Sequence, residues 1–142
     1  MKKHVFRIAL ILLFCLMLLS AVSCSDGVDT DQAKTDVRAF LSAVEKEDYE
    51  TAQTYLHPDR PADLATYFAR VETEEKVDFS AGIEILKETG FSYSYYESEV
   101  DGSVYELDLD VRIGGVTAEI EVEVVKNDNG YGIYNLEIDV ED

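Results

Sequence analysis

The segment VYELDLDVRIGGVTAEIEVEVV, residues 104–125, decides the fold. On each side of Gly114-Gly115, apolar and polar residues alternate with the period of a half-buried strand. Two consecutive glycines suit a tight hairpin turn. The alternation therefore predicts two antiparallel strands with one apolar face and one acidic face. The residues expected on the apolar face are Tyr105, Leu107, Leu109, Val111, Ile113, Val116, Ala118, Ile120, Val122 and Val124.

The alternation continues on the C-terminal side of this hairpin. Residues 127–130, NDNG, have the composition of a turn. Tyr134, Leu136, Ile138 and Val140 then recur at every second position. They predict a further strand with these four side chains on the apolar face.

The alternation also continues on the N-terminal side. Asp101-Gly102 is a strong two-residue turn signal after residues 91–100, FSYSYYESEV. The side chains expected on the apolar side of that strand are Phe91, Tyr93 and Tyr95. A short strand over residues 83–86 and a turn over 87–90 are expected before it. We therefore expect a curved antiparallel sheet of four to five strands.

Before the sheet, apolar residues recur at the three- and four-residue spacing of amphipathic helices. We expect a first helix over residues 30–47. Asp48 caps a second helix, which ends at His57-Pro58 because a residue before proline is disfavoured in the helical region. A third helix starts at Asp59-Arg60-Pro61, since proline suits the first turn, and a charged exit loop follows over residues 72–78. Helices followed by an antiparallel meander make an α+β domain in which the helices cover the apolar face of the sheet.

The helical opening carries a resemblance to a known superfamily. Residues 40–52, FLSAVEKEDYETA, leading to residues 55–58, YLHP, look like the opening of the nuclear-transport-factor-two-like, cystatin-like superfamily. In element order the resemblance covers nearly all of residues 30–142. It implies a cystatin-like cone, in which a curved sheet wraps around the helices.

The first residues have the layout of an export signal. A basic start is followed by twelve apolar residues over 8–19, fewer than the ~20 that a helix needs to span a bilayer. Residues 21–24, AVSC, resemble the lipobox of bacterial lipoproteins. The resemblance implies a signal peptide over residues 1–23, a lipid on Cys24 and a tether over residues 24–29. It places the domain outside the cytoplasm, anchored to the cell membrane, or to an outer membrane where one exists.

The cysteine count agrees with this interpretation. Cys15 lies in the apolar run and leaves with the signal, so that Cys24 is the only cysteine of the mature chain. An intramolecular disulfide is therefore excluded. Lipid chains on Cys24 would hold the protein to a membrane, because two or more chains anchor stably.

Composition and charge exclude two classes of protein. The chain has 12 basic and 30 acidic residues, and removal of Lys2, Lys3 and Arg7 with the signal leaves a formal charge of −21. Binding of nucleic acid through phosphate contacts needs clustered cations and is excluded. Apolar residues make up 46% of the chain, which excludes a wholly disordered acidic protein. The acidic domain should also stand off from anionic lipids.

The acidic face of the sheet is the first candidate site. A tight turn at Gly114-Gly115 sets the cross-strand pairs Asp110–Glu119, Asp108–Glu121 and Glu106–Glu123. The next turn can place Glu119 beside Glu137 and Thr117 beside Asp139. Like charges in directly opposed positions are destabilising, and calcium takes six to eight oxygen ligands. Asp108, Asp110, Glu119 and Glu121 are therefore candidate calcium ligands; a solvated face and a docking surface for a basic partner are the alternatives.

The interior of the predicted cone is the second candidate site. Its candidate lining residues are Tyr55, Tyr67, Tyr93, Tyr95, Tyr105 and Tyr134. In ketosteroid isomerase-like members of the superfamily, a carboxylic acid or histidine in the cone acts as base, and tyrosines donate to the oxyanion. The apolar face of this sequence offers no inward acid, which counts against catalysis. The alternative is that the tyrosines are core residues whose hydroxyl groups reach the rim.

His57, the one histidine of the mature chain, is the third candidate. Asp59 lies two residues further on and could orient it as a base, but a helix-ending role before Pro58 is the simpler interpretation. One histidine and one acylated cysteine cannot form a usual zinc site, and we assign no catalytic residue.

The sequence thus predicts a membrane-anchored, extracytoplasmic binding or accessory module of the cell envelope that is not an enzyme. The space between helices and sheet would take a small apolar or mixed ligand, or be filled by the protein's own side chains. A domain that docks a basic envelope protein or divalent cations through its acidic face is the second hypothesis, and an isomerase-like enzyme is the third.

Overall fold

The computed structural model describes residues 27–95 and 102–141 of the chain. Helices come first: α2 (Thr30–Glu45), α3 (Tyr49–Gln53), α4 (Leu64–Glu75) and the short 3-10 helix η1 (Phe79–Ala81). The strands β1 (Ile83–Tyr95), β2 (Gly102–Ile113), β3 (Val116–Asn127) and β4 (Gly130–Val140) follow. They form one antiparallel sheet in the order β1-β2-β3-β4. The predicted α+β class is confirmed, and the described sheet has four strands.

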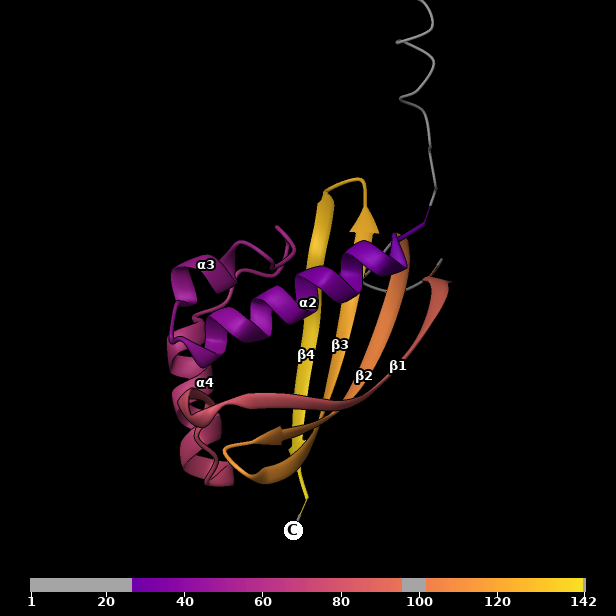
Figure 1. Cartoon of the computed structure of the whole chain (residues 1–142). Helices are drawn as coiled ribbons and strands as arrows, with labels where there is room; N and C mark the ends of the chain where they lie inside the picture. Colours follow the sequence, from indigo (N-terminus) through magenta and orange to yellow (C-terminus); the bar gives the residue numbers. More distant parts are fainter. Residues whose placement is uncertain (1–26, 96–101, 142) are drawn as a thin grey trace, which may run out of the picture.

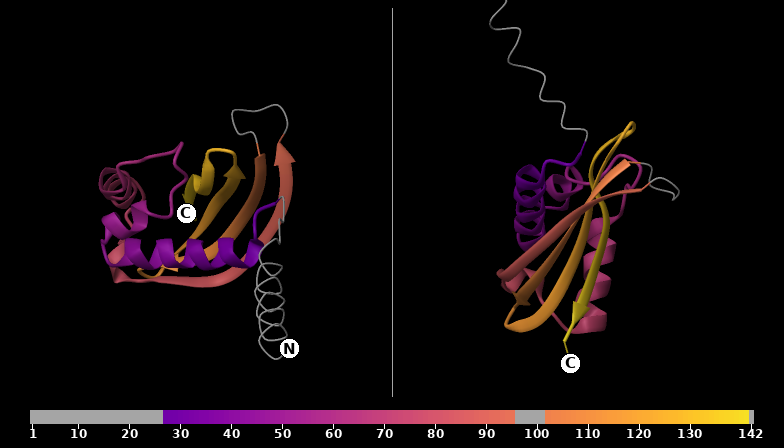
Figure 2. Two further views of the ribbon diagram at one scale, coloured as in Figure 1. Left: turned by 90° about the horizontal axis from the view of Figure 1, so that it is seen from above. Right: turned by 90° about the vertical axis from the view of Figure 1, so that its right-hand side faces the viewer.

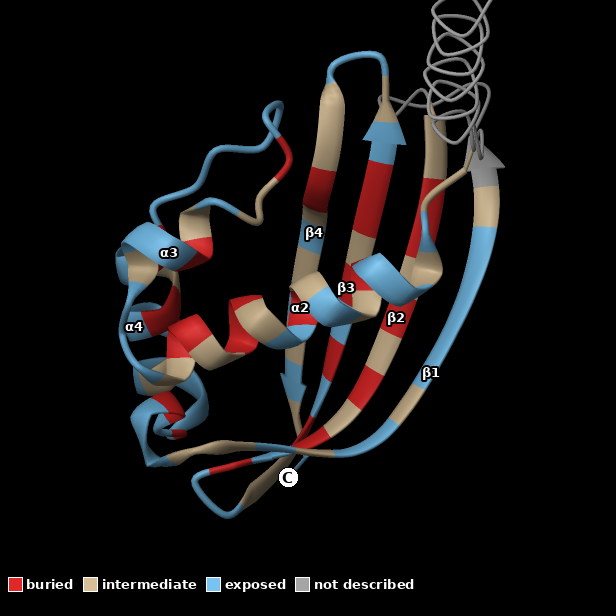
Figure 3. Cartoon of the chain, turned by 45° about the horizontal axis from the view of Figure 1, so that its top comes forward, coloured by how far each residue is buried: buried red, intermediate tan, exposed pale blue. Residues whose placement is uncertain are grey.

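The helices occupy two positions relative to the sheet (Figures 1 and 2). α2 crosses the face of the sheet, whereas α3 and α4 lie beyond β4 (Figures 1 and 2). Buried residues are concentrated in α2 and in the central strands, and β1 is largely exposed (Figure 3). No helix in the described part of the chain is long and apolar enough to cross a membrane.

Aspartate side chains fix where the helices begin. Asp29 accepts hydrogen bonds from the backbone N–H groups of Asp31 and Gln32, and Asp48 accepts one from the N–H of Thr51. Such caps satisfy N–H groups that have no partner within the helix. The third helix begins at Leu64, capped by Asp63, and not at residues 59–61 as the proline suggested. It also continues to Glu75, through part of the segment expected as a loop.

Aromatic rings join the helices into the core. The Phe68 ring of α4 is fully buried, and its centroid lies 6.2 Å from that of Phe40 of α2 and 5.0 Å from that of Phe79 of η1. Burying one such side chain contributes roughly 1.5–3 kcal/mol. At the edge of the sheet, Lys34 and Arg38 of α2 form ion pairs with Glu88 of β1. α2 is therefore held against the sheet by apolar packing and by ion pairs at its rim.

The central hairpin has the predicted register. The pairs Asp110–Glu119, Asp108–Glu121 and Glu106–Glu123 are all present. Residues of the opposite parity in β2 and β3, from Tyr105 to Ile113 and from Ala118 to Val124, are buried. The predicted apolar and acidic faces of this hairpin are thus confirmed.

A bulge in β1 changes the outer strand. Ile85 pairs with Val111 and Lys87 with Asp110, so that Leu86 is the extra residue. A bulge accommodates one unpaired residue without ending the strand. β1 is therefore one continuous strand, and the turn expected over residues 87–90 was wrong. The bulge also moves Phe91 and Tyr93 to the acidic face, opposite Glu106 and Val104, which corrects the apolar side assigned to them.

A second bulge lies in β4. Val124 pairs with Ile133 and Glu123 with Asn135, which leaves Tyr134 as the extra residue. Beyond it, Glu121 lies opposite Glu137 and Glu119 opposite Asp139. The expected pairs Glu119–Glu137 and Thr117–Asp139 were therefore wrong by two positions: the turn closes with Asn127 opposite Gly130, which accounts for one position, and the bulge accounts for the other.

Candidate functional site

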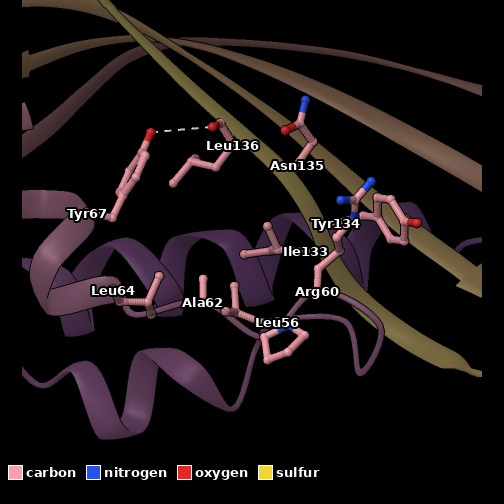
Figure 4. Close-up of a pocket in the computed structure, with 10 residues that line it drawn as sticks. Leu56, Arg60, Ala62, Leu64, Tyr67, Ile133, Tyr134, Asn135 and Leu136 are labelled. Atoms are coloured by element: carbon pink, nitrogen blue, oxygen red, sulfur yellow. Dashed lines mark hydrogen bonds between the residues drawn. The ribbon is translucent and has the colours of Figure 1, made fainter.

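A pocket of about 190 Å³ lies between β4, α4 and the loop that joins α3 to α4 (Figure 4). Apolar side chains dominate its lining. The residues around it are Leu56, Arg60, Pro61, Ala62, Leu64, Tyr67, Ile133, Tyr134, Asn135 and Leu136. At one end the Tyr67 hydroxyl donates a hydrogen bond of 3.4 Å to the carbonyl oxygen of Leu136. At the other end the Arg60 guanidinium lies 4.4 Å from the centre of the Tyr134 ring, a cation–π arrangement.

The loop is fixed to β4 by main-chain hydrogen bonds. The N–H of Ile133 donates to the carbonyl of Tyr55, and the N–H of His57 donates to the carbonyl of Ile133, both at 2.8 Å. Leu56 and Ile133 thus form a parallel bridge. Gly132 permits this approach: its φ is +153°, and a Cβ there would lie 2.6 Å from the His57 nitrogen. The glycine therefore sets the wall of the pocket.

His57 supports this wall from inside. Its side chain is 0% exposed, and its Nδ1 accepts a hydrogen bond of 3.1 Å from the N–H of Asp59. The other nitrogen, Nε2, then carries the proton and donates to Oδ1 of Asn127 at 3.1 Å. Because both ring nitrogens are engaged, the contacts of His57 are those of a structural strut between the loop and the β3–β4 turn.

The five candidate tyrosines whose side chains are described do not meet in one cavity. Tyr67 and Tyr134 line the pocket, and burial raises the pKa of Tyr67. Tyr55 is half-buried outside that lining, and Tyr105 is buried in the core, where its ring lies over Gly90. Tyr93 lies on the acidic face, and the side chain of Tyr95 lies outside what the structure describes. The expectation of a tyrosine-lined interior therefore reduces to two residues at the rim.

The acidic face holds closely spaced carboxylates. The Tyr93 hydroxyl donates to Glu123 at 2.9 Å and to Glu106 at 3.3 Å; burial and then the bond to Glu123 raise the pKa of Tyr93. Burial raises the pKa of Glu121, and so do the charges of four neighbours. Those neighbours are Glu106, Asp108, Glu137 and Glu123. The face therefore has a negative potential that few nearby cations offset.

The four candidate calcium ligands lie side by side as two cross-strand pairs. Asp108 faces Glu121, and Asp110 faces Glu119. Lys87 is 3.7 Å from Asp110 and competes for that carboxylate. Among the described residues, no group of three or more acidic, histidine or cysteine side chains is placed to hold a metal ion. Calcium binding stays an untested alternative for this face, and the lipid on Cys24 stays a prediction, because Cys24 lies outside the described residues.

The pocket beside β4 was not predicted from the sequence. Its lining depends on the bulge at Tyr134 and on the bridge between Leu56 and Ile133, and that bridge joins segments that are remote in sequence. The available signal was Gly132, because a glycine inside a predicted strand marks a bulge or a close approach of another backbone.

Comparisons with protein-family models, with characterised proteins and with solved structures found no match for this chain.

Proposed function

We propose that this protein is a lipid-anchored, extracytoplasmic module of the bacterial cell envelope that binds another protein and does no catalysis. The export signal and the lipobox-like sequence ending at Cys24 support the anchor. The closed core supports binding at the surface, and this is the observation that carries the proposal. Side chains that are 0% exposed fill the space between the helices and the sheet; among them are Phe40, Phe68, Leu107 and Ile120.

The buried groups favour binding over catalysis. His57 is the one buried polar or charged side chain in the described residues. Its side chain is 0% exposed, and its two ring nitrogens are occupied by the N–H of Asp59 and by Asn127, so neither nitrogen is open to a substrate. An isomerase-like mechanism needs an acid or base with access to substrate. The arrangement of His57 therefore supports a module without a reaction centre.

The size of the pocket favours a protein partner over a small ligand. Small-molecule sites occupy roughly 300–1,000 Å³, whereas the pocket beside β4 has about 190 Å³. A volume of that order suits one or two apolar side chains of a partner. The second hypothesis is that the acidic face docks a basic partner. It gains support from the adjacent carboxylates of Glu119 and Glu121 on β3 and Glu137 on β4, the strand that lines the pocket.

The finer fold assignment is part of this proposal. A long helix, a short second helix and a third helix precede a four-stranded meander, and α2 lies across the face of the sheet. This order supports assignment to the cystatin-like cone superfamily as a small member with a closed interior.

Metabolic labelling tests the anchor. Cells that express the full chain are given a palmitate analogue, and the protein is tested for incorporated label. We expect label on the wild type and on Cys15→Ser, because Cys15 leaves with the signal, and no label on Cys24→Ser. Label that persists in Cys24→Ser, or none in the wild type, would refute the anchored module.

A further inference from the structure

We propose that the free edge of β4, together with the pocket beside it, binds an extended segment of a partner protein in which apolar residues alternate with lysine or arginine. The inference rests on the proposed function, and it specifies the partner by the chemistry of the side chains that the site would accept. Three features carry it: unpaired main-chain groups, a half-covered apolar row that ends in the pocket, and an acidic row on the other face.

The main chain of β4 has an open side. β4 is an edge strand of the described sheet, since β3 is its one neighbouring strand there. The carbonyl of Leu136 points away from β3, toward Tyr67, whereas the N–H of Glu141 points to β3 and donates to Thr117. Because these directions alternate along a strand, the N–H and C=O groups of Ile138 and Val140 face outward. An exposed edge of this kind is a template for an added strand.

The protein already uses this edge once. Residues 55–57 pair with β4 at Ile133 through two hydrogen bonds of 2.8 Å. The chain then turns away at Pro58, and the pocket opens where the added segment ends. A partner strand paired with Ile138 and Val140 would continue the same line and place a side chain at the mouth of the pocket, where the Tyr67 hydroxyl holds the Leu136 carbonyl.

The inner face of the edge is apolar and only half covered. Leu136, Ile138 and Val140 are partly exposed, whereas their β3 partners Val122, Ile120 and Ala118 are at most 2% exposed. Side chains of an added strand alternate between faces, so every second residue of the partner would cover this row. One of these residues would enter the pocket between Leu64, Tyr67 and Leu136. These positions select aliphatic side chains.

The outer face selects basic side chains at the alternate positions. Glu137 and Asp139 of β4 lie beside Glu121 and Glu119 of β3, which gives two carboxylates on the edge strand and two on its neighbour. A lysine or arginine opposite them would relieve their repulsion, as opposite charges in cross-strand pairs do. A second copy of this chain is a poor occupant, because edge-to-edge pairing of two β4 strands would bring Glu137 and Asp139 of both copies together.

Peptide binding to the purified full-length protein tests the inference. The probe is a fluorescent synthetic peptide of about eight residues, a usual strand length, in which Val or Leu alternates with Lys or Arg. One control peptide has the same composition with the basic residues in one block. A second control has glutamate in place of each basic residue. We expect the alternating peptide alone to bind with saturation, the block peptide at least about tenfold more weakly, and the acidic peptide not at all.

Three variants locate the binding. Ala62→Trp fills the pocket from its exposed wall, and Ala65→Trp is its matched control, exposed on α4 and outside the pocket lining. Ile138→Pro removes an outward N–H and leaves the β3 ladder intact, a place where edge strands tolerate proline. We expect Ala62→Trp and Ile138→Pro to weaken binding about tenfold or more, and Ala65→Trp to bind like the wild type. Circular dichroism confirms that each variant is folded.

Each other result overturns the inference. Equal binding of the alternating and block peptides would mean capture by charge alone. Unchanged binding by Ala62→Trp would show that the pocket takes no part in binding. A dimer in analytical ultracentrifugation that becomes a monomer in Ile138→Pro would show that a second copy of the chain occupies the edge. If the peptide does not bind but Cys24 carries the palmitate label, the peptide-binding inference is wrong and the anchored module stands. If the peptide binds but Cys24 carries no label, the anchored module is wrong and the peptide-binding inference stands.

Discussion

His57 shows how the meaning of one residue depends on its surroundings. A histidine two positions before an aspartate suggests an oriented base, but Nδ1 accepts from the Asp59 main chain, and Nε2 donates to Asn127. The Asp59 carboxylate accepts a hydrogen bond of 2.9 Å from the Asn129 side chain, and the same oxygen lies 3.7 Å from His57 Nδ1. The sequence gives the residue types but not the direction of their bonds, and that direction separates a strut from a catalyst.

Loss of this strut should destabilise the domain. We expect Asn127→Ala to lower the free energy of unfolding by about 1–3 kcal/mol, because it leaves the buried Nε2–H of His57 without its acceptor. His57→Ala should cost about 2–4 kcal/mol, since it also leaves a cavity. Urea unfolding measures both. Asn135→Ala, an exposed change on the same hairpin, should cost less than about 0.5 kcal/mol; equal losses for all three would contradict the role of the strut.

Glu121 should make stability depend on pH. Its pKa is raised in the folded protein, by burial first and then by neighbouring carboxylates. A raised carboxyl pKa stabilises the fold below the pKa of the unfolded chain, and this contribution is lost as the pH rises through the folded pKa. At neutral pH the ionised side chain is therefore unfavourable.

Glu121→Gln is then expected to stabilise the protein at neutral pH by up to about 0.5 kcal/mol, the scale of one unfavourable cross-strand pair. The gain should vanish well below the ordinary pKa of glutamate. Thermal unfolding across this range measures it, with Glu75→Gln at the end of α4 as the charge-matched control. A gain that persists at low pH, or an equal gain in the control, would show that the carboxylate ladder is not its source.

At the scale of elements, regular alternation was readable from the sequence and its interruptions were not. The β2–β3 hairpin follows directly from two alternating runs around Gly114-Gly115. The bulges at Leu86 and Tyr134 shift each outer strand by one residue. Leu86 has no glycine or proline beside it to indicate a bulge, whereas Gly132 lies two residues before Tyr134. Each bulge changes the face to which the following side chains point. For this reason Tyr93 lies on the acidic face and not in the predicted interior, and the pocket at β4 was not predicted.

The junction between the α3–α4 loop and β4 depends on Gly132. Gly132→Ala should lower the melting temperature strongly, because the new Cβ would meet the main chain of Leu56 and His57 at 2.6 Å. We expect the free energy of unfolding to fall by about 2–4 kcal/mol, as it does for other substitutions that force a close contact in a packed region. Gly115→Ala is the matched control: its φ is +94°, with no atom within 4 Å of the added Cβ, so strain alone should cost about 1 kcal/mol. Similar losses for both variants would mean that the close approach contributes little.

At the scale of the whole molecule, charge sets the balance between folding and repulsion. The mature chain predicted from the sequence has a formal charge of −21, and many of its carboxylates lie on one face of the sheet. A compact state concentrates this charge, so the folded protein gains more from screening than the unfolded chain does. This property was predictable from composition, whereas the side of the molecule that carries the charge required the strand register.

Salt should therefore stabilise the protein, and the kind of salt tests the calcium alternative. We expect sodium chloride to raise the melting temperature by screening, and calcium chloride at the same ionic strength to raise it equally, because the four candidate ligands are arranged as two opposed pairs and Lys87 contacts one of them. Differential scanning calorimetry measures both shifts. A larger shift with calcium would identify a bound ion, and loss of that excess in Asp108→Asn but not in Glu75→Gln would assign it to the ladder. Equal shifts in both salts would leave the acidic face free for the lysine and arginine side chains of a partner strand.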